Sequence, residues 1–150
     1  MPQGEVAIRE QRLDEVVHQL EVAGTLGAEN VAQVARRIDA ALAGGVRWLI
    51  VDLSGASPVA DPMLAALVAT AQALRSRRGE LIVAGAAPDV AERLGAYDVA
   101  HRPALAANVD QAIMILKMLR PKTKLQRPEG RARQKITSLT LPRIEPRPLN

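Results

Sequence analysis

An aspartate followed by a proline, Asp61-Pro62, opens an apolar run that continues to Leu74. Aspartate oxygens accept hydrogen bonds from the free N–H groups at the start of a helix, and proline at the first helical position lacks an N–H that would otherwise stay unpaired. We therefore predict that Asp61 is the N-cap of a helix and that Pro62 is its first residue. Its carboxylate would place a negative charge at a helix end that favours anions.

Other residues that could carry chemistry are few. The chain has no cysteine, which excludes disulfides, thiolate catalysis and cysteine-bound zinc. It contains none of the patterns G-x-x-x-x-G-K-[ST], G-x-S-x-G and H-E-x-x-H. His18 and His101 lack a metal-ligand spacing, and we expect each at the surface or in a strand. Asp52 would suit a phosphate-accepting receiver, but the acidic pair and the late lysine of such a site do not occur. We expect no enzyme, no metal and no cofactor.

Apolar periodicity predicts the elements that position Asp61. In chain order they are strands at 5–13 and 16–23, a break at 24–27, a helix at 31–42, a strand at 48–51, the helix from 61, a strand at 81–84, a short helix at 88–94, a weak strand at 99–101 and a helix capped by Asn108. The strands at 48–51 and 81–84 are continuously apolar, as expected when both faces are covered. Strands that alternate with helices favour parallel pairing, so we predict an α/β sandwich.

The charge is divided unevenly along the chain. Residues 120–150 hold nine Lys or Arg against two Glu, a net charge of +7, whereas residues 1–119 hold eleven basic against fourteen acidic groups, a net charge of −3. We predict a domain over 1–119 and a basic, proline-rich, disordered tail over 120–150. This tail either keeps the protein soluble or contacts nucleic acid. Neither a secretory signal nor a membrane span is predicted, and we expect a cytoplasmic protein.

The segment from Asp52 to Leu67, DLSGASPVADPMLAAL, resembles the STAS domain of bacterial anti-sigma factor antagonists, in which these positions are similar to DLSGVTFIDSSGLGAL. The resemblance extends from about Glu5 to Leu119. It implies a mixed β-sheet of four to five strands with about four helices and the opening hairpin at one edge. The serine that a partner kinase phosphorylates in this family corresponds to Asp61. The resemblance thus implies a phospho-switch surface without its hydroxyl group.

A second family residue also differs in this chain. The family pattern GELD corresponds to Gly24-Thr25-Leu26-Gly27, so glycine stands where an aspartate lies beside the phosphoserine in the family. Loss of that acid would reduce the repulsion on Asp61. Phosphorylation in the family releases the anti-sigma partner, so a fixed charge would either weaken this binding or suit a partner that prefers it.

The resemblance implies that the protein is a regulator that binds an anti-sigma factor, a kinase-like protein, and so affects transcription. The alternative is a STAS scaffold or adaptor in a signalling complex or a lipid-transport assembly. A nucleic-acid partner is expected only through the basic tail. The residues expected at the partner surface are Asp61, Pro62, Met63, Leu64, Gly27 and Glu29.

Overall fold

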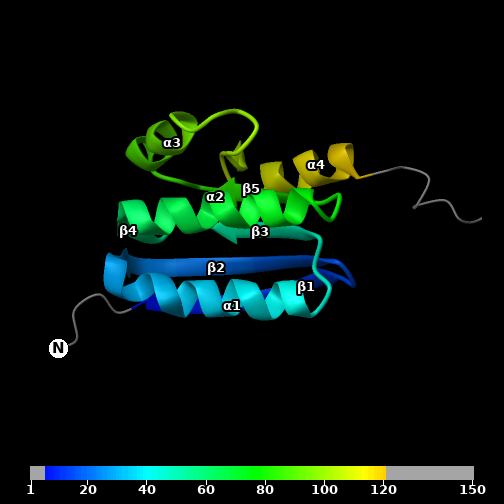
Figure 1. Cartoon of the computed structure of the whole chain (residues 1–150), viewed down its shortest axis with the longest axis horizontal. Coiled ribbons are helices and arrows are strands. Elements are labelled where there is room, and N and C mark those ends of the chain that lie inside the picture. Colours follow the sequence, from blue (N-terminus) through cyan, green and yellow to red (C-terminus); the bar gives the residue numbers. More distant parts are fainter. Residues whose placement is uncertain (1–5, 121–150) are drawn as a thin grey trace, which may run out of the picture. The chain divides into compact units, whose positions relative to one another are not determined.

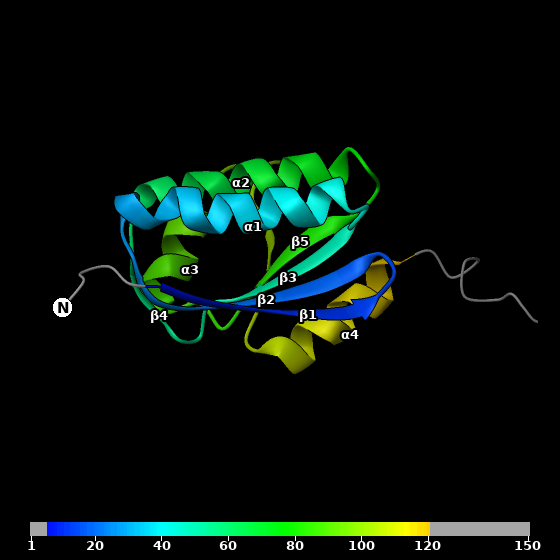
Figure 2. The same cartoon turned by 90° about the horizontal axis from the view of Figure 1, so that it is seen from below.

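The computed structural model describes residues 6–120 (Figures 1 and 2). The predicted tail therefore lies outside the described residues, apart from Arg120. The chain divides into two units, Met1–Met118 and Leu119–Asn150. The described elements are β1 (Val6–Asp14), β2 (Val17–Leu26), the 3-10 helix η1 (Ala28–Asn30), α1 (Val31–Ala43), β3 (Trp48–Asp52), β4 (Ala56–Val59), α2 (Asp61–Arg75), β5 (Glu80–Ala84), α3 (Pro88–Gly95), β6 (Ala104–Ala106) and α4 (Val109–Leu119).

The strands form one mixed sheet in the order β1-β2-β3-β5-β6, and β4 also pairs with β2. The β1–β2 hairpin is antiparallel and lies at one edge of the sheet, whereas all other pairs are parallel. The predicted mixed α/β sheet with an edge hairpin is confirmed. Parallel pairing aligns the ends of β2, β3 and β5, so the segments that follow them, beginning at Gly27, Leu53 and Gly85, meet along one side. We call this side the carboxyl edge, and the opposite side, where these strands begin, the amino edge.

The two faces of the sheet are buried by different helices. Alternate side chains of the central strands point to opposite faces of the sheet. On one face, side chains such as Leu49 and Val83 pack under α1, α2 and α3, and on the other face, side chains such as Ile50 and Ile82 pack against α4. Figure 2 shows α1 and α2 on one side of the sheet and α4 on the other. Because β3 and β5 are covered on both sides, they have no polar alternation, as the sequence predicted.

Three strand predictions were wrong. No prediction covered β4, because Pro58 lies within it and proline disfavours an interior strand position. The predicted break after residue 23 is part of β2, which continues to Leu26 since Gly24 and Leu26 pair with β4. The predicted strand at 99–101 is a turn, in which the carbonyl of Asp98 accepts the N–H groups of the third and fourth following residues, and the last strand is β6 instead.

The start of α4 follows the prediction. The backbone N–H of Gln111 donates to Asn108 Oδ1 at 2.8 Å, and Gln111 Oε1 accepts from the N–H of Ala107 at 2.6 Å. These two bonds satisfy backbone donors at the helix entrance, as a capping box does.

Candidate functional site

The start of α2 is fixed to the carboxyl edge by the backbone. Val59 in β4 is in register with Leu26 at the end of β2, and the N–H of Ala60 donates to the carbonyl of Leu26 at 2.8 Å. The carbonyl of Ala60 then accepts from the N–H of Met63 at 3.0 Å, the first hydrogen bond of the helix. Asp61 therefore lies directly beside the end of β2 and the residue that follows it, Gly27.

The predicted cap was wrong by one residue. Ala60 has extended backbone angles and is the N-cap, so Asp61 is the first helical residue and Pro62 the second. No side chain caps this helix end. The carboxylate of Asp61, whose side chain is 86% exposed, is thus available for a partner outside its own helix.

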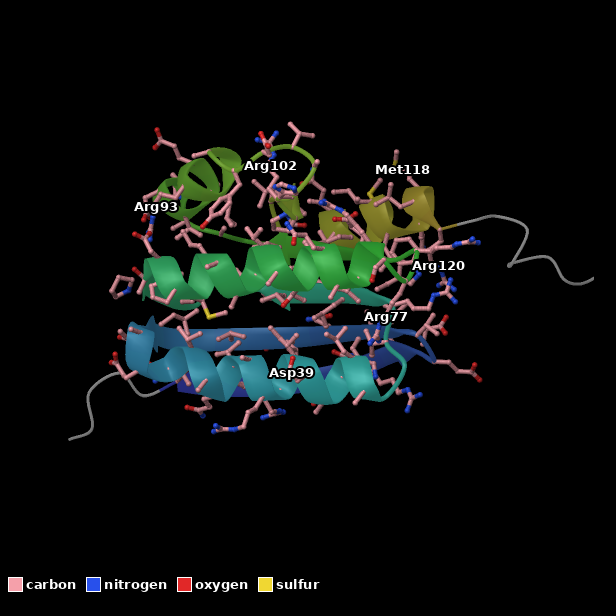
Figure 3. All side chains as sticks on the ribbon, in the orientation of Figure 1. Asp39, Arg77, Arg93, Arg102, Met118 and Arg120 are labelled. Carbon is pink, nitrogen blue, oxygen red and sulfur yellow. The ribbon has the colours of Figure 1, made fainter. Side chains whose placement is uncertain are left out.

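That partner within the chain is Arg93. Arg93 Nη2 donates to Asp61 Oδ1 at 2.5 Å, and Nη1 donates to Asp89 Oδ2, one turn earlier in α3, at 3.3 Å. Figure 3 shows Arg93 beside the first turn of α2. The guanidinium group therefore joins the start of α2 to α3.

This arrangement changes the electrostatics around Asp61. The hydrogen bond to Asp61, together with the attraction of the Asp61 and Asp89 carboxylates, raises the pKa of Arg93 above its ordinary value. Arg93 is therefore protonated throughout the physiological pH range. The two carboxylates and one guanidinium carry a net charge of −1, so Asp61 is not an isolated negative charge.

An acidic side chain lies close to Gly27. A Cβ atom at Gly27 would lie 2.6 Å from Glu29 Oε1 and 2.9 Å from Oε2, so the exposed Glu29 carboxylate occupies the space where a side chain at 27 would begin. The N–H of Gly27 donates to Asn30 Oδ1 at 3.2 Å. The Glu29 carboxylate therefore lies beside Gly27, and the effect of the missing acid on Asp61 stays a prediction.

The first turns of α2 divide into a buried and an exposed side. Met63 and Leu64 are 1% and 2% exposed and belong to the core under α2. Both were expected at the partner surface, but their side chains are covered because the sheet lies under this side of the helix. The exposed positions at the start of α2 are Asp61, Pro62 and Ala65.

Two neighbouring loops complete the carboxyl edge. The N–H of Ser54 donates to Asp52 Oδ1 at 3.0 Å, so Asp52 stabilises the turn after β3. Gly85, with φ +70°, lies against this turn: a Cβ atom there would be 2.9 Å from that of Ser54. The left-handed backbone and this close approach both favour glycine. They fix the loop after β5 that leads into α3 and Arg93.

Among residues 6–120, no group of three or more His, Asp or Glu side chains could hold a metal ion. His18 Nδ1 lies 3.1 Å from Glu10 Oε2, and His101 lies in the turn before β6. No helix in the described part of the chain is both long and apolar enough for a membrane span.

Comparison with known proteins identifies the family. The family model of the STAS domain matches residues 9–112. The chain belongs to the STAS domain family. Among curated proteins, no sequence matches significantly.

Solved structures of anti-sigma factor antagonists have the same fold. An anti-sigma factor antagonist from Mycobacterium paratuberculosis has 19% sequence identity and a TM-score of 0.67, over 76% of this chain and 96% of that one. The anti-sigma factor antagonist SpoIIAA in its unphosphorylated form has 17% identity and a TM-score of 0.60, over 74% and 98% of the two chains. The phosphorylated form of SpoIIAA, a Bacillus cell fate determinant, has 16% identity and the same TM-score of 0.60, over 73% and 98%. The fold thus matches both forms equally.

Sequence reasoning missed Arg93. The only local signal was the spacing of Asp89 and Arg93, four residues apart on a short helix, which is also typical of a solvated surface pair. Only the tertiary fold, which brings α3 beside the start of α2, shows that the guanidinium binds Asp61.

Proposed function

We propose that this STAS protein is an anti-sigma factor antagonist that binds its partner through the carboxyl edge, without a serine phosphorylation switch. The partner surface consists of the exposed residues at the start of α2, namely Asp61, Pro62 and Ala65, together with Gly27 and Glu29. The observation that carries the proposal is the exposed Asp61 at the first position of α2, where the family has its phosphorylated serine.

The small residues around Asp61 support a protein partner. Pro62 and Ala65 project little from the helix, so a partner can approach the α2 backbone closely and cover it with few side chains to immobilise. Met63 and Leu64 contribute by packing beneath this surface and not by direct contact. A preformed surface of this kind is typical of interfaces that change little on binding.

The absence of a switch is supported by Asp61 and Arg93. A carboxylate cannot accept phosphate as a stable ester, and a phosphoserine would bring a larger charge and three acceptor oxygens. Arg93 already binds the Asp61 carboxylate at 2.5 Å. The surface therefore has one permanent charge state, partly neutralised by its own arginine.

This permanent state also favours a second candidate, a STAS scaffold or adaptor in a signalling complex or a lipid-transport assembly. A scaffold needs the same exposed edge but no release of its partner. The two candidates differ in the partner's class, since the first requires an anti-sigma factor of the kinase-like type.

Affinity capture with the full chain, followed by mass spectrometry, distinguishes the candidates. We expect the wild type to retain a kinase-like anti-sigma factor and Ala65→Arg to lose it. The matched control is Ala40→Arg, at an exposed alanine near the end of α1. Recovery of a transport ATPase or other scaffold components would support the second candidate.

The missing switch is tested with Asp61→Ser and the captured kinase. We expect this variant to accept phosphate or to change its affinity for the partner, whereas the wild type is not labelled at this position. If Asp61→Ser behaves as the wild type in both respects, residue 61 has no switch role and serves only as the start of α2.

A further inference from the structure

The amino edge brings three connections of the chain together around Arg47. The N–H of Arg47 donates to the carbonyl of Val16, in the β1–β2 turn, at 2.9 Å, and its carbonyl accepts from the N–H of Glu80 at 3.0 Å. Gly79 lies so close that a Cβ atom there would be 1.6 Å from the carbonyl oxygen of Arg47. Because neighbouring strands lie about 4.8 Å apart, Val16, Arg47 and Gly79 together span only about 10 Å.

These three connections carry more positive than negative charge. Together with the ends of the elements that they join, they hold five arginines against three acids, a net charge of +2. The charged residues are Arg12, Asp14, Glu15, Arg47, Arg75, Arg77, Arg78 and Glu80. Within residues 6–120, the only one of these arginines in an ion pair is Arg75, whose partner is Glu80. The positive charge of the other four is not neutralised in this way.

Two of these four arginines bind backbone carbonyl groups. Arg77 Nη1 donates to the carbonyl of Leu42, at the end of α1, at 2.7 Å, and Figure 3 shows Arg77 beside the connection from α1 to β3. Arg12 donates to the carbonyls of Asp14 and Glu15, both at 3.4 Å. Bonds of this kind satisfy carbonyl groups at helix ends and turns, so they explain these two arginines without a ligand.

Arg47 and Arg78 have no such explanation. The Nε atom of Arg47 is buried and donates no hydrogen bond within the described part of the chain. A buried, unpaired donor of a charged group is unfavourable, and a ligand that accepts from it removes this cost. Arg78 is exposed, and its side chain makes no interaction with residues 6–120. Its φ of +66° lies in the left-handed region that favours glycine after a helix, so an arginine stands where the backbone disfavours a side chain.

The chemistry of these guanidinium groups favours a small phosphate ligand. A guanidinium donates parallel hydrogen bonds to phosphate oxygens, and each phosphate group offers several acceptors and up to two negative charges. Two linked phosphates match the short distance between the connections that carry Arg47 and Arg78. A duplex nucleic acid fits less well, because its phosphates extend along its whole length. Trp48, the aromatic residue next to Arg47, is buried and cannot stack on a base.

We propose that Arg47 and Arg78 form a site at the amino edge for a small molecule with two linked phosphate groups. Arg47 binds the oxygens of one phosphate, with its Nε atom as one of the donors, and Arg78 binds those of the other. Arg12 and Arg77 strengthen the positive potential around the site. The site lies opposite the start of α2, so it does not depend on the partner surface proposed at the carboxyl edge.

The test is urea unfolding of the full chain with and without inorganic pyrophosphate, at constant ionic strength. A ligand of the folded protein raises the urea midpoint, whereas an anion attracted equally by the folded and the unfolded chain leaves it unchanged. We expect pyrophosphate to raise the midpoint of the wild type. With pyrophosphate at about ten times its Kd, a roughly tenfold loss of affinity in Arg47→Gln or Arg78→Gln reduces the stabilisation to about a third. The matched control Arg36→Gln, at an exposed arginine of α1, should respond as the wild type.

Each variant is compared with its own midpoint without pyrophosphate, so a change in stability caused by the substitution itself does not affect the result. Three outcomes would overturn the proposal. One is a wild-type midpoint that pyrophosphate does not raise. Another is an equal increase in all four proteins, which would indicate the general effect of phosphate salts on folding. The third is duplex DNA that raises the midpoint where pyrophosphate does not, which would indicate a nucleic-acid surface.

Discussion

Replacing Met63 by alanine tests whether this residue stabilises the core under α2 or contacts the partner directly. Met63 is 1% exposed and packs in the core between α2 and the sheet. Truncation of a buried methionine to alanine removes apolar contacts and leaves a cavity, which lowers the free energy of unfolding by about 2–5 kcal/mol. In a domain of this size each kcal/mol lowers the melting temperature by roughly 4 °C, so we expect a loss on the order of 10 °C.

Urea unfolding followed by circular dichroism measures this effect. The midpoint should decrease while the dependence of the free energy on urea stays unchanged, because the native and unfolded surfaces are nearly the same. Ala65→Gln, at the exposed position two residues later, is the control and should change stability by less than about 0.5 kcal/mol. A Met63→Ala protein that unfolds at the wild-type urea concentration but binds its partner more weakly would show that Met63 is a contact residue and would refute the packing argument.

Three further outcomes are expected from the described contacts. Gly79→Ala should lower the free energy of unfolding, measured in urea, by more than about 3 kcal/mol, because the new Cβ would lie 1.6 Å from the carbonyl oxygen of Arg47 and only backbone movement relieves this clash. Soluble protein with a wild-type urea midpoint would contradict this backbone geometry. Arg75→Lys should lower the free energy of unfolding by about 1–3 kcal/mol, because one lysine cannot make the two hydrogen bonds to Glu80, at 2.8 and 3.0 Å, together with the bonds to two backbone carbonyls. An unchanged urea midpoint would show that this network is not stabilising. Because the Asp61 and Asp89 carboxylates raise the pKa of Arg93, its favourable contribution to stability is lost only at strongly alkaline pH. The stability difference between wild type and Arg93→Gln should therefore be constant from about pH 6 to pH 10, and a difference that disappears in this range would argue against the ion pair.

Most of the fold could be predicted because its signals are local. The spacing of apolar residues in α1 and the two glycines after it define that helix, and the Asn108 cap with Gln111 defines the start of α4. Buried strands with continuous apolar runs, such as β3, are equally clear. The family resemblance then supplied the mixed sheet and the hairpin at its edge, which local patterns alone leave open.

The errors occurred where tertiary contacts override local preference. β4 contains Pro58 and is stabilised by pairing with β2, and β6 has only three residues that pair with β5. At the site, the exposure of Asp61 could be predicted from its place before an apolar helix, but the burial of Met63 depends on which side of α2 lies on the sheet. The bond from Arg93 to Asp61 joins residues 32 positions apart and has no local signal.

Isothermal titration calorimetry of the full chain with the captured partner tests most directly whether the carboxyl edge is the binding surface. Ala65→Arg places a long charged side chain beside Asp61, whereas Ala40→Arg places the same side chain at the far end of α1. We expect that Ala65→Arg weakens binding by about a hundredfold or more, as expected for a charge forced into an interface, and that Ala40→Arg binds as the wild type. Equal affinities for Ala65→Arg and the wild type would contradict the assignment of the carboxyl edge as the binding surface.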